Sequence, residues 1–185
     1  MKRVFIIAEA GVNHNGSLEM AKRLVDVAAE AGADAVKFQT FVPEEVAAVG
    51  AERAPYQREA MPGRAESQLE MIRRLALRPE DFRALKAYCD GRGIMFLSTP
   101  FDYFSVNLLD SLGVPLFKVA SGELVNHPFL AYVASKGKPM LLSTGMASLG
   151  EVEEALAVVR GAGCEQVTLL HCTSAYPAPV EEANL

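Results

Sequence analysis

Six short apolar runs divide this chain, and each run gives way to polar residues at its carboxyl end. The runs cover residues 4–8, 35–40, 94–97, 116–120, 140–142 and 167–170. The first run closes on Glu9, and the last is followed by His171. Buried parallel strands have such near-continuous apolar sequences, and enzymes of this class build their active sites at the carboxyl ends of the strands. The pattern therefore predicts six buried parallel strands and an enzyme.

Helix signals lie between these runs. The helices are expected at residues 17–32, 79–91 and 148–161. Ser17 is the expected N-cap of the first helix, Gly91 the expected stop of the second, and Ser148 with Glu151 the expected capping box of the third. Strands and helices alternate at the length of one βα unit, which predicts an α/β fold of the TIM (β/α)8 barrel type. About six strands are present, so we expect an incomplete barrel whose open edge favours a homo-oligomer.

The composition argues against several classes of partner. The 185 residues carry a net charge of −5 without long blocks of one sign, which argues against nucleic acid and against an anionic membrane. Half of the residues are hydrophobic, yet no run reaches the ~20 apolar residues of a membrane span. No signal peptide is evident after Lys2 and Arg3, so we expect a cytoplasmic protein with reduced cysteines.

Residues 41–78 interrupt the alternation of strands and helices. The segment contains three prolines, two glycines and five arginines: Pro43, Pro55, Pro62, Gly50, Gly63, Arg53, Arg58, Arg64, Arg73 and Arg74. We expect a long loop with a short helix near its end. A loop of this length in a compact domain is usually functional, which places it over the active-site face.

Two lysines interrupt the apolar strands. Because side chains alternate along a strand, Lys37 shares one face with Gln39, while Val36 and Phe38 share the other. Lys118 lies between two apolar neighbours in the same way. Lysine is seldom buried without a partner or a task. Two such cations at strand ends would suit an anion that carries both phosphate and carboxylate.

Hydroxyl side chains recur at three further strand ends. Thr99, Ser121 and Ser143 would form the cradle that a phosphate group requires. The alternative for the lysines is structural, with one or both reaching solvent or pairing with Glu9.

Six motifs together resemble the sialic acid synthase family, which includes N-acetylneuraminate synthase and the spore coat polysaccharide synthases. They are residues 7–16 (IAEAGVNHNG), 36–40 (VKFQT), 98–101 (STPF), 118–123 (KVASGE), 142–146 (LSTGM) and 171–177 (HCTSAYP). The resemblance covers nearly the whole chain. It implies a (β/α)8 barrel that condenses phosphoenolpyruvate with an N-acetylated aldose and releases phosphate. The product would be a sialic-acid-like nonulosonic acid.

The resemblance also implies roles for individual residues. Glu9 and Lys37 would be catalytic, with Glu9 near the reacting carbons. The phosphoenolpyruvate site would contain Lys37, Thr99, Lys118, Ser121, Ser143 and Ser174. The sugar would face Gln39, Glu123 and Tyr176. Ser174 stands where some members of the family have an asparagine.

A divalent metal, commonly manganese or magnesium, is implied as well. The two histidine ligands of the family lie on later strands, so no residue here is assigned to the metal. We therefore expect residues 1–185 alone not to be fully competent. The alternative is a site formed by Glu9, His14 and His171, although single histidines in such positions more often make structural hydrogen bonds.

Two other functions remain open from the residues alone. One is a Schiff-base class I aldolase with Lys37 or Lys118 as the nucleophile, because burial favours the neutral amine. The other is a non-catalytic module that binds a phosphorylated metabolite or serves only in assembly.

Overall fold

The computed structural model describes residues 3–53, 66–175 and 177–184. The chain forms two compact units, Met1–Phe96 and Leu97–Leu185. No helix in the described ranges is long and apolar enough to cross a membrane.

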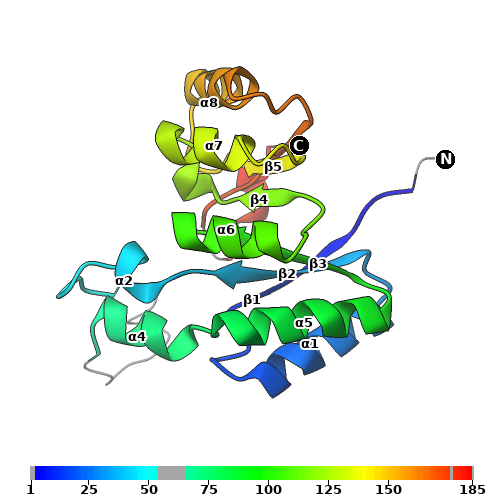
Figure 1. Cartoon of the computed structure of the whole chain (residues 1–185). Coiled ribbons are helices and arrows are strands. Elements are labelled where there is room, and N and C mark those ends of the chain that lie inside the picture. Colours follow the sequence, from blue (N-terminus) through cyan, green and yellow to red (C-terminus); the bar gives the residue numbers. More distant parts are fainter. Residues whose placement is uncertain (1–2, 54–65, 176, 185) are drawn as a thin grey trace. The chain divides into compact units, whose positions relative to one another are not determined.

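Over its described residues, the first unit contains two strands, the start of a third, and four helices. The elements are β1 (Ile7–Gly11), α1 (Leu18–Glu30), β2 (Ala35–Thr40), α2 (Pro43–Val46), α4 (Gln68–Leu75), α5 (Pro79–Arg92) and β3 (Met95–Pro100), which continues into the second unit. The strand order is β1-β2-β3, and β1 pairs with β2 in parallel. Helices α1 and α5 lie side by side (Figure 1).

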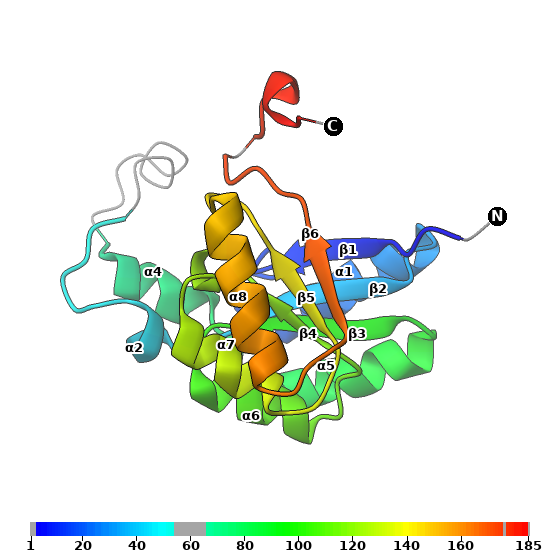
Figure 2. The same ribbon diagram turned by 90° about the horizontal axis from the view of Figure 1, so that it is seen from above.

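The second unit repeats the alternation of strand and helix. Its elements are α6 (Tyr103–Ser111), β4 (Phe117–Val119), η1 (Ser121–Glu123), α7 (His127–Ala134), β5 (Met140–Ser143), α8 (Leu149–Gly161), β6 (Val167–Leu170) and η2 (Val180–Glu182). The three strands form a parallel sheet in the order β4-β5-β6. Helices α7 and α8 pack against each other (Figure 2). Because the strands are parallel, their carboxyl ends all lie at the same end of the sheet.

Side-chain caps explain where several helices begin. The Ser17 side chain accepts a hydrogen bond from the Met20 backbone and caps α1, as the sequence predicts. Ser148 and Glu151 form the predicted capping box of α8. The predicted stop at Gly91 is wrong, because α5 runs to Arg92 and ends at Gly93. Only Gly93 has the left-handed conformation (φ +69°) that terminates the helix.

The alternation of faces along β2 agrees with the sequence pattern. Val36 and Phe38 are fully buried, and Phe38 stacks on Phe96 with ring centroids 6.0 Å apart. Lys37 and Gln39 occupy the opposite face of the strand. The polar residues of β2 are therefore separated from the apolar core of the first unit.

The expectation of six buried strands is wrong at two places. β1 begins at Ile7 rather than Val4, because its ladder with β2 starts at the pair Ile7 and Ala35. Val4 is 75% exposed. β6 is also largely exposed, with Leu169 at 41%. Both are terminal strands in the order of their sheets, so only one neighbouring strand shields each of them.

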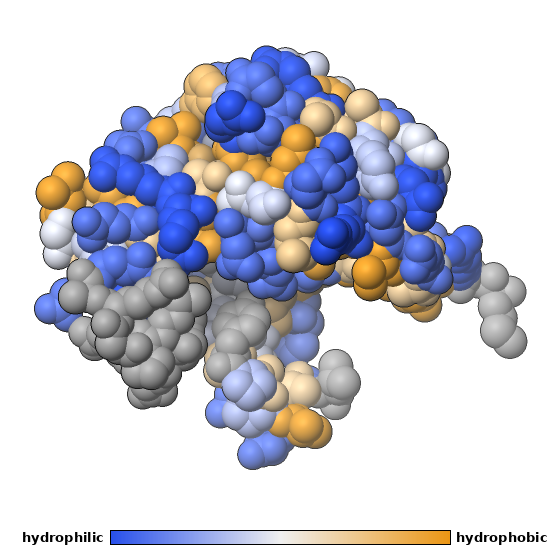
Figure 3. Space-filling view, turned by 90° about the horizontal axis from the view of Figure 1, so that it is seen from below, coloured by the Kyte–Doolittle hydropathy of each residue, from blue (hydrophilic) through white to orange (hydrophobic). Residues whose placement is uncertain are grey.

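Charged side chains on the helix surfaces are mostly paired locally. Lys86 and Asp90 form an ion pair one turn apart on α5, and Arg92 pairs with Asp26 of α1. The face in Figure 3 shows hydrophilic side chains interspersed with apolar ones. Such mixing agrees with the absence of long charge blocks in the sequence.

Candidate active site

The first cluster of polar side chains lies where β1 and β2 pair. Lys37 Nζ and Glu9 Oε2 are 2.6 Å apart. The Lys37 side chain is 11% exposed, whereas that of Glu9 is 51% exposed. A half-exposed carboxylate therefore holds a nearly buried ammonium group, and both residues belong to the catalytic set predicted from the sequence.

A bulge in β1 directly follows the residue that carries the carboxylate. Glu9 pairs in register with Lys37, but the next pair is Gly11 with Phe38, so Ala10 is the extra residue. Gly11 has φ +53°, a conformation that glycine adopts without strain. A Cβ atom on Gly11 would lie 3.1 Å from Glu9 Oε1 and 3.8 Å from Gln39 Nε2. The second carboxylate oxygen and the Gln39 amide thus both lie close to Gly11.

The second unit holds the other predicted lysine. Lys118 lies on β4 between two fully buried neighbours and is itself 8% exposed. Its Nζ donates a hydrogen bond of 2.8 Å to the Val119 carbonyl. The ammonium group is therefore drawn toward the carboxyl end of β4.

Hydroxyl groups surround the ends of the strands in the second unit. Thr99 near the end of β3 is 2% exposed, and Ser143, the last residue of β5, is 7% exposed. Ser121 begins η1 directly after β4, and its Oγ accepts a 3.0 Å hydrogen bond from the Gly145 backbone N–H. The Ser174 hydroxyl also lies beside Gly145. The structure thus brings Ser121 and Ser174 together from loops more than fifty residues apart.

Two predicted sugar contacts have different outcomes. Glu123 accepts a 2.8 Å hydrogen bond from the Asn126 side chain, which in turn caps α7. It therefore supports the start of a helix, and a sugar contact for it stays a prediction. Tyr176 lies outside the described residues.

The predicted site residues are divided between the two units. Glu9, Lys37 and Gln39 belong to the first unit, and the remaining described residues belong to the second. The structure brings together members of each set within its own unit. The convergence of Lys37 and Lys118 on one anion stays a prediction.

Two histidines of the alternative metal site, His14 and His171, make hydrogen bonds within their own units. His14 is 1% exposed, its Nδ1 accepts a hydrogen bond from the Gly16 N–H, and burial lowers the pKa of its ring. His171 is exposed, and its Nε2 lies 2.6 Å from the Ala183 carbonyl oxygen. Among the residues that the structure describes, no three His, Cys, Asp or Glu side chains gather as a metal site. These residues do not fit a divalent metal, and we derive no step through one.

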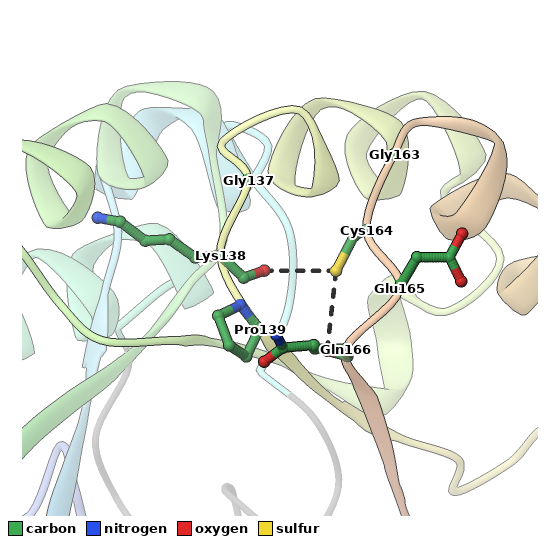
Figure 4. Close-up of a pocket in the computed structure, with 7 residues that line it drawn as sticks. All are labelled: Gly137, Lys138, Pro139, Gly163, Cys164, Glu165 and Gln166. Carbon is green, nitrogen blue, oxygen red and sulfur yellow. Dashed lines mark hydrogen bonds between the residues drawn. The ribbon is translucent and has the colours of Figure 1, made fainter.

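A pocket opens at the opposite end of the second sheet (Figure 4). It is lined by Gly137 to Pro139, which precede β5, and by Gly163 to Gln166, which precede β6. The Cys164 thiol lies within it and donates to the Lys138 carbonyl at 3.3 Å. This pocket faces the amino ends of the strands, so it is separate from the candidate site.

Residues 24–185 match the family model described as the NeuB family. The chain belongs to the NeuB family. It is 50% identical to N,N'-diacetyllegionaminic acid synthase from Campylobacter jejuni, over all of this chain and 56% of that protein. It is 38% identical to human N-acetylneuraminate-9-phosphate synthase, over 98% of this chain and 50% of that protein. The chain thus spans about half the length of these curated relatives.

Structural comparison gives the same family. The N-acetylneuraminic acid synthetase of Leptospira borgpetersenii, solved in complex with citrate, is similar with a TM-score of 0.83 and 34% sequence identity. The match covers 99% of this chain and 59% of that one. The resemblance to the sialic acid synthase family is confirmed, as is the fold class: α/β of the TIM-barrel type, with six strands in the part of this NeuB chain that the structure describes.

The sequence reasoning missed two glycines of this NeuB site. Gly11 allows the bulge next to Glu9, and Gly145 lies beside two predicted substrate hydroxyls. A glycine at or near the end of a strand was the available signal, but it equally marks an ordinary turn. Only the packed structure distinguishes a glycine that makes room for site residues from one that simply allows a turn.

Proposed function

We propose that these residues belong to an enzyme that condenses phosphoenolpyruvate with an N-acetylated aldose to give a sialic-acid-like nonulosonic acid. The observation that carries the proposal is the Lys37 and Glu9 ion pair, which places a cation and a carboxylate within three residues of the carboxyl ends of two paired parallel strands. Active sites of parallel α/β folds lie at the carboxyl ends of the strands. Membership of the NeuB family and the names of the relatives support the same reaction class.

The anionic substrate would be bound by cations and hydroxyl donors. Lys37 and Lys118 are both nearly buried, so each attracts an anion more strongly than a solvated lysine does. Ser121 uses an acceptor position for the Gly145 N–H, which leaves its O–H proton to donate to a substrate oxygen. Thr99, Ser143 and Ser174 would supply further hydroxyls.

The proposed reaction forms one carbon–carbon bond and breaks one carbon–oxygen bond. C3 of phosphoenolpyruvate attacks the aldehyde carbon of the open-chain sugar, and the aldehyde oxygen takes up a proton. Water adds at C2, phosphate leaves from the same carbon, and a keto acid results. The site must hold both substrates in contact, because the enol carbon is a weak nucleophile and gains most from proximity.

Glu9 is the group that we assign to the reacting carbons. One of its oxygens is held by Lys37, and the other lies beside Gly11 near Gln39. This orientation would set the carboxylate against the aldehyde end of the sugar. Gln39, Glu123 and Tyr176 would contact the hydroxyl and acetamido groups.

A Schiff-base aldolase is the alternative that chemistry can test directly. In the structure Lys37 Nζ is engaged by a carboxylate and Lys118 Nζ donates to a carbonyl, whereas a nucleophile must present a lone pair. Borohydride with pyruvate should therefore leave the mass of the protein unchanged. A stable adduct on either lysine would favour the aldolase.

The proposal itself is tested by binding and by turnover. Calorimetry should show phosphoenolpyruvate binding to this chain. A turnover assay should show release of phosphate from phosphoenolpyruvate only when an aldose such as N-acetylmannosamine is present. Absence of phosphoenolpyruvate binding, or phosphate release that ignores the aldose, would contradict the proposed function.

A further inference from the structure

We infer that Gly145 is a positioning residue, whose missing side chain leaves the space in which the Ser121 and Ser174 hydroxyls meet the anionic substrate. This inference rests on the proposed function and adds a residue to it. The sequence places Gly145 two residues after the last residue of β5, in the loop that follows that strand.

Space, rather than backbone conformation, requires glycine at this position. The φ angle of Gly145 is not positive, so an alanine would fit its backbone without strain. A Cβ atom there would overlap the Ser174 hydroxyl and would lie 3.0 Å from Ser121 Oγ. The Cys172 carbonyl oxygen would be 3.4 Å away. An added methyl group must therefore displace at least one of the two hydroxyls.

The loop around Gly145 is held firmly on both sides. The Thr144 backbone N–H and its Oγ1 both donate to the Leu170 carbonyl, at 3.1 and 3.0 Å. On the other side Gly145 N–H donates to Ser121 Oγ. Because these bonds tie the loop to those that follow β4 and β6, the loop cannot easily move away from an added methyl group.

Backbone strain at the next residue is consistent with a functional loop. Met146 has φ +64° and is 76% exposed. An unbranched but bulky residue in the left-handed region is uncommon and tends to occur where the surrounding structure enforces it. The hydrogen bonds of Thr144 and Gly145 lie directly before this residue.

A set of alanine variants tests the inference by calorimetry with phosphoenolpyruvate. Gly145→Ala should weaken binding roughly tenfold or more, as loss of a hydrogen bond to a charged group does. Ser174→Ala should weaken it similarly. The double variant should bind no more weakly than Gly145→Ala alone, because both changes remove the same contact. Gly150→Ala is the matched control, since its Cβ meets open space and its φ is not positive; it should bind like the parent chain.

The outcomes separate this inference from the proposed function. If the parent chain does not bind phosphoenolpyruvate, the proposed function fails. If the parent binds and Gly145→Ala binds equally well, the positioning role is overturned. Additive losses in the double variant would also overturn it, because they would indicate a separate structural defect. If Gly145→Ala does not fold, the double variant takes its place, because it lacks the overlap with Ser174 Oγ. Its affinity for phosphoenolpyruvate is then compared with that of Ser174→Ala. A further tenfold loss in the double variant would then reject the inference.

Discussion

Lys37 Nζ lies 2.6 Å from Glu9 Oε2, across the register position at which β1 and β2 pair. The lysine is nearly buried and the glutamate is half-exposed. An ion pair with one solvent-exposed partner contributes little to stability. When the pair is broken, water replaces the ammonium group and stabilises the exposed carboxylate almost as well. The arrangement therefore suits chemistry at the strand ends better than it suits reinforcement of the fold.

Glu9→Gln should separate these two roles. We expect the free energy of unfolding in urea to fall by less than ~1 kcal/mol, since the partner carboxylate is exposed. Turnover should fall by roughly 100-fold or more, the usual range for loss of a positioned acid or base. Unchanged turnover would remove Glu9 from the catalytic set.

Lys118→Ala should weaken phosphoenolpyruvate binding by ~1.5–3 kcal/mol, the range for a charge-assisted hydrogen bond. Lys138→Ala is the matched control. That lysine pairs with Asp110 at 2.7 Å and lies at the amino end of β5, away from the candidate site. Calorimetry that gives the same dissociation constant for Lys118→Ala and the parent chain would reject the assignment.

Gly16→Ala should destabilise the first unit more than an ordinary change at a left-handed glycine. Gly16 has φ +77°, and a Cβ atom there would overlap the Arg74 carbonyl oxygen. Gly137, at φ +68°, has open space around its Cβ position. We expect Gly137→Ala to cost about 1–2 kcal/mol from the backbone alone. Gly16→Ala should cost a further ~1–3 kcal/mol from the overlap.

The two glycine variants are compared by urea unfolding. Equal losses would show that the end of α4 moves away from the loop after β1 at no cost. A larger loss for Gly16→Ala would support a fixed contact there.

His14 should make stability fall in mild acid. Burial lowers the pKa of the folded ring below its value of 6.5 in the unfolded chain. The unfolded chain therefore takes up the proton first, so stability present above pH 6.5 is lost as the pH falls toward the folded pKa. His14→Asn keeps an acceptor for the Gly16 N–H but does not titrate. Urea unfolding between pH 7.5 and 5 should show a smaller loss in this variant, and an unchanged slope would contradict the assignment.

Much of the candidate site follows from strand periodicity. The alternation along β2 predicts that Lys37 and Gln39 share the face opposite Phe38, and the buried side chains agree. The helix starts at Ser17 and Ser148 were equally predictable, since a cap depends on residues within one turn. The end of α5 was not, because two glycines, Gly91 and Gly93, compete and only the packed chain selects one.

The sequence alone determines the fold class, the family and the residue types at the strand ends, because these depend on local patterns and on motifs read in order. Tertiary structure decides which groups meet. The register of β1 with β2 sets Glu9 opposite Lys37, and Gly145 leaves room for Ser121 and Ser174. These approaches join residues tens of positions apart, and their distances follow from how the strands and loops pack. Hydrophobic periodicity carries no information about such distances, which is why the structure alone reveals them.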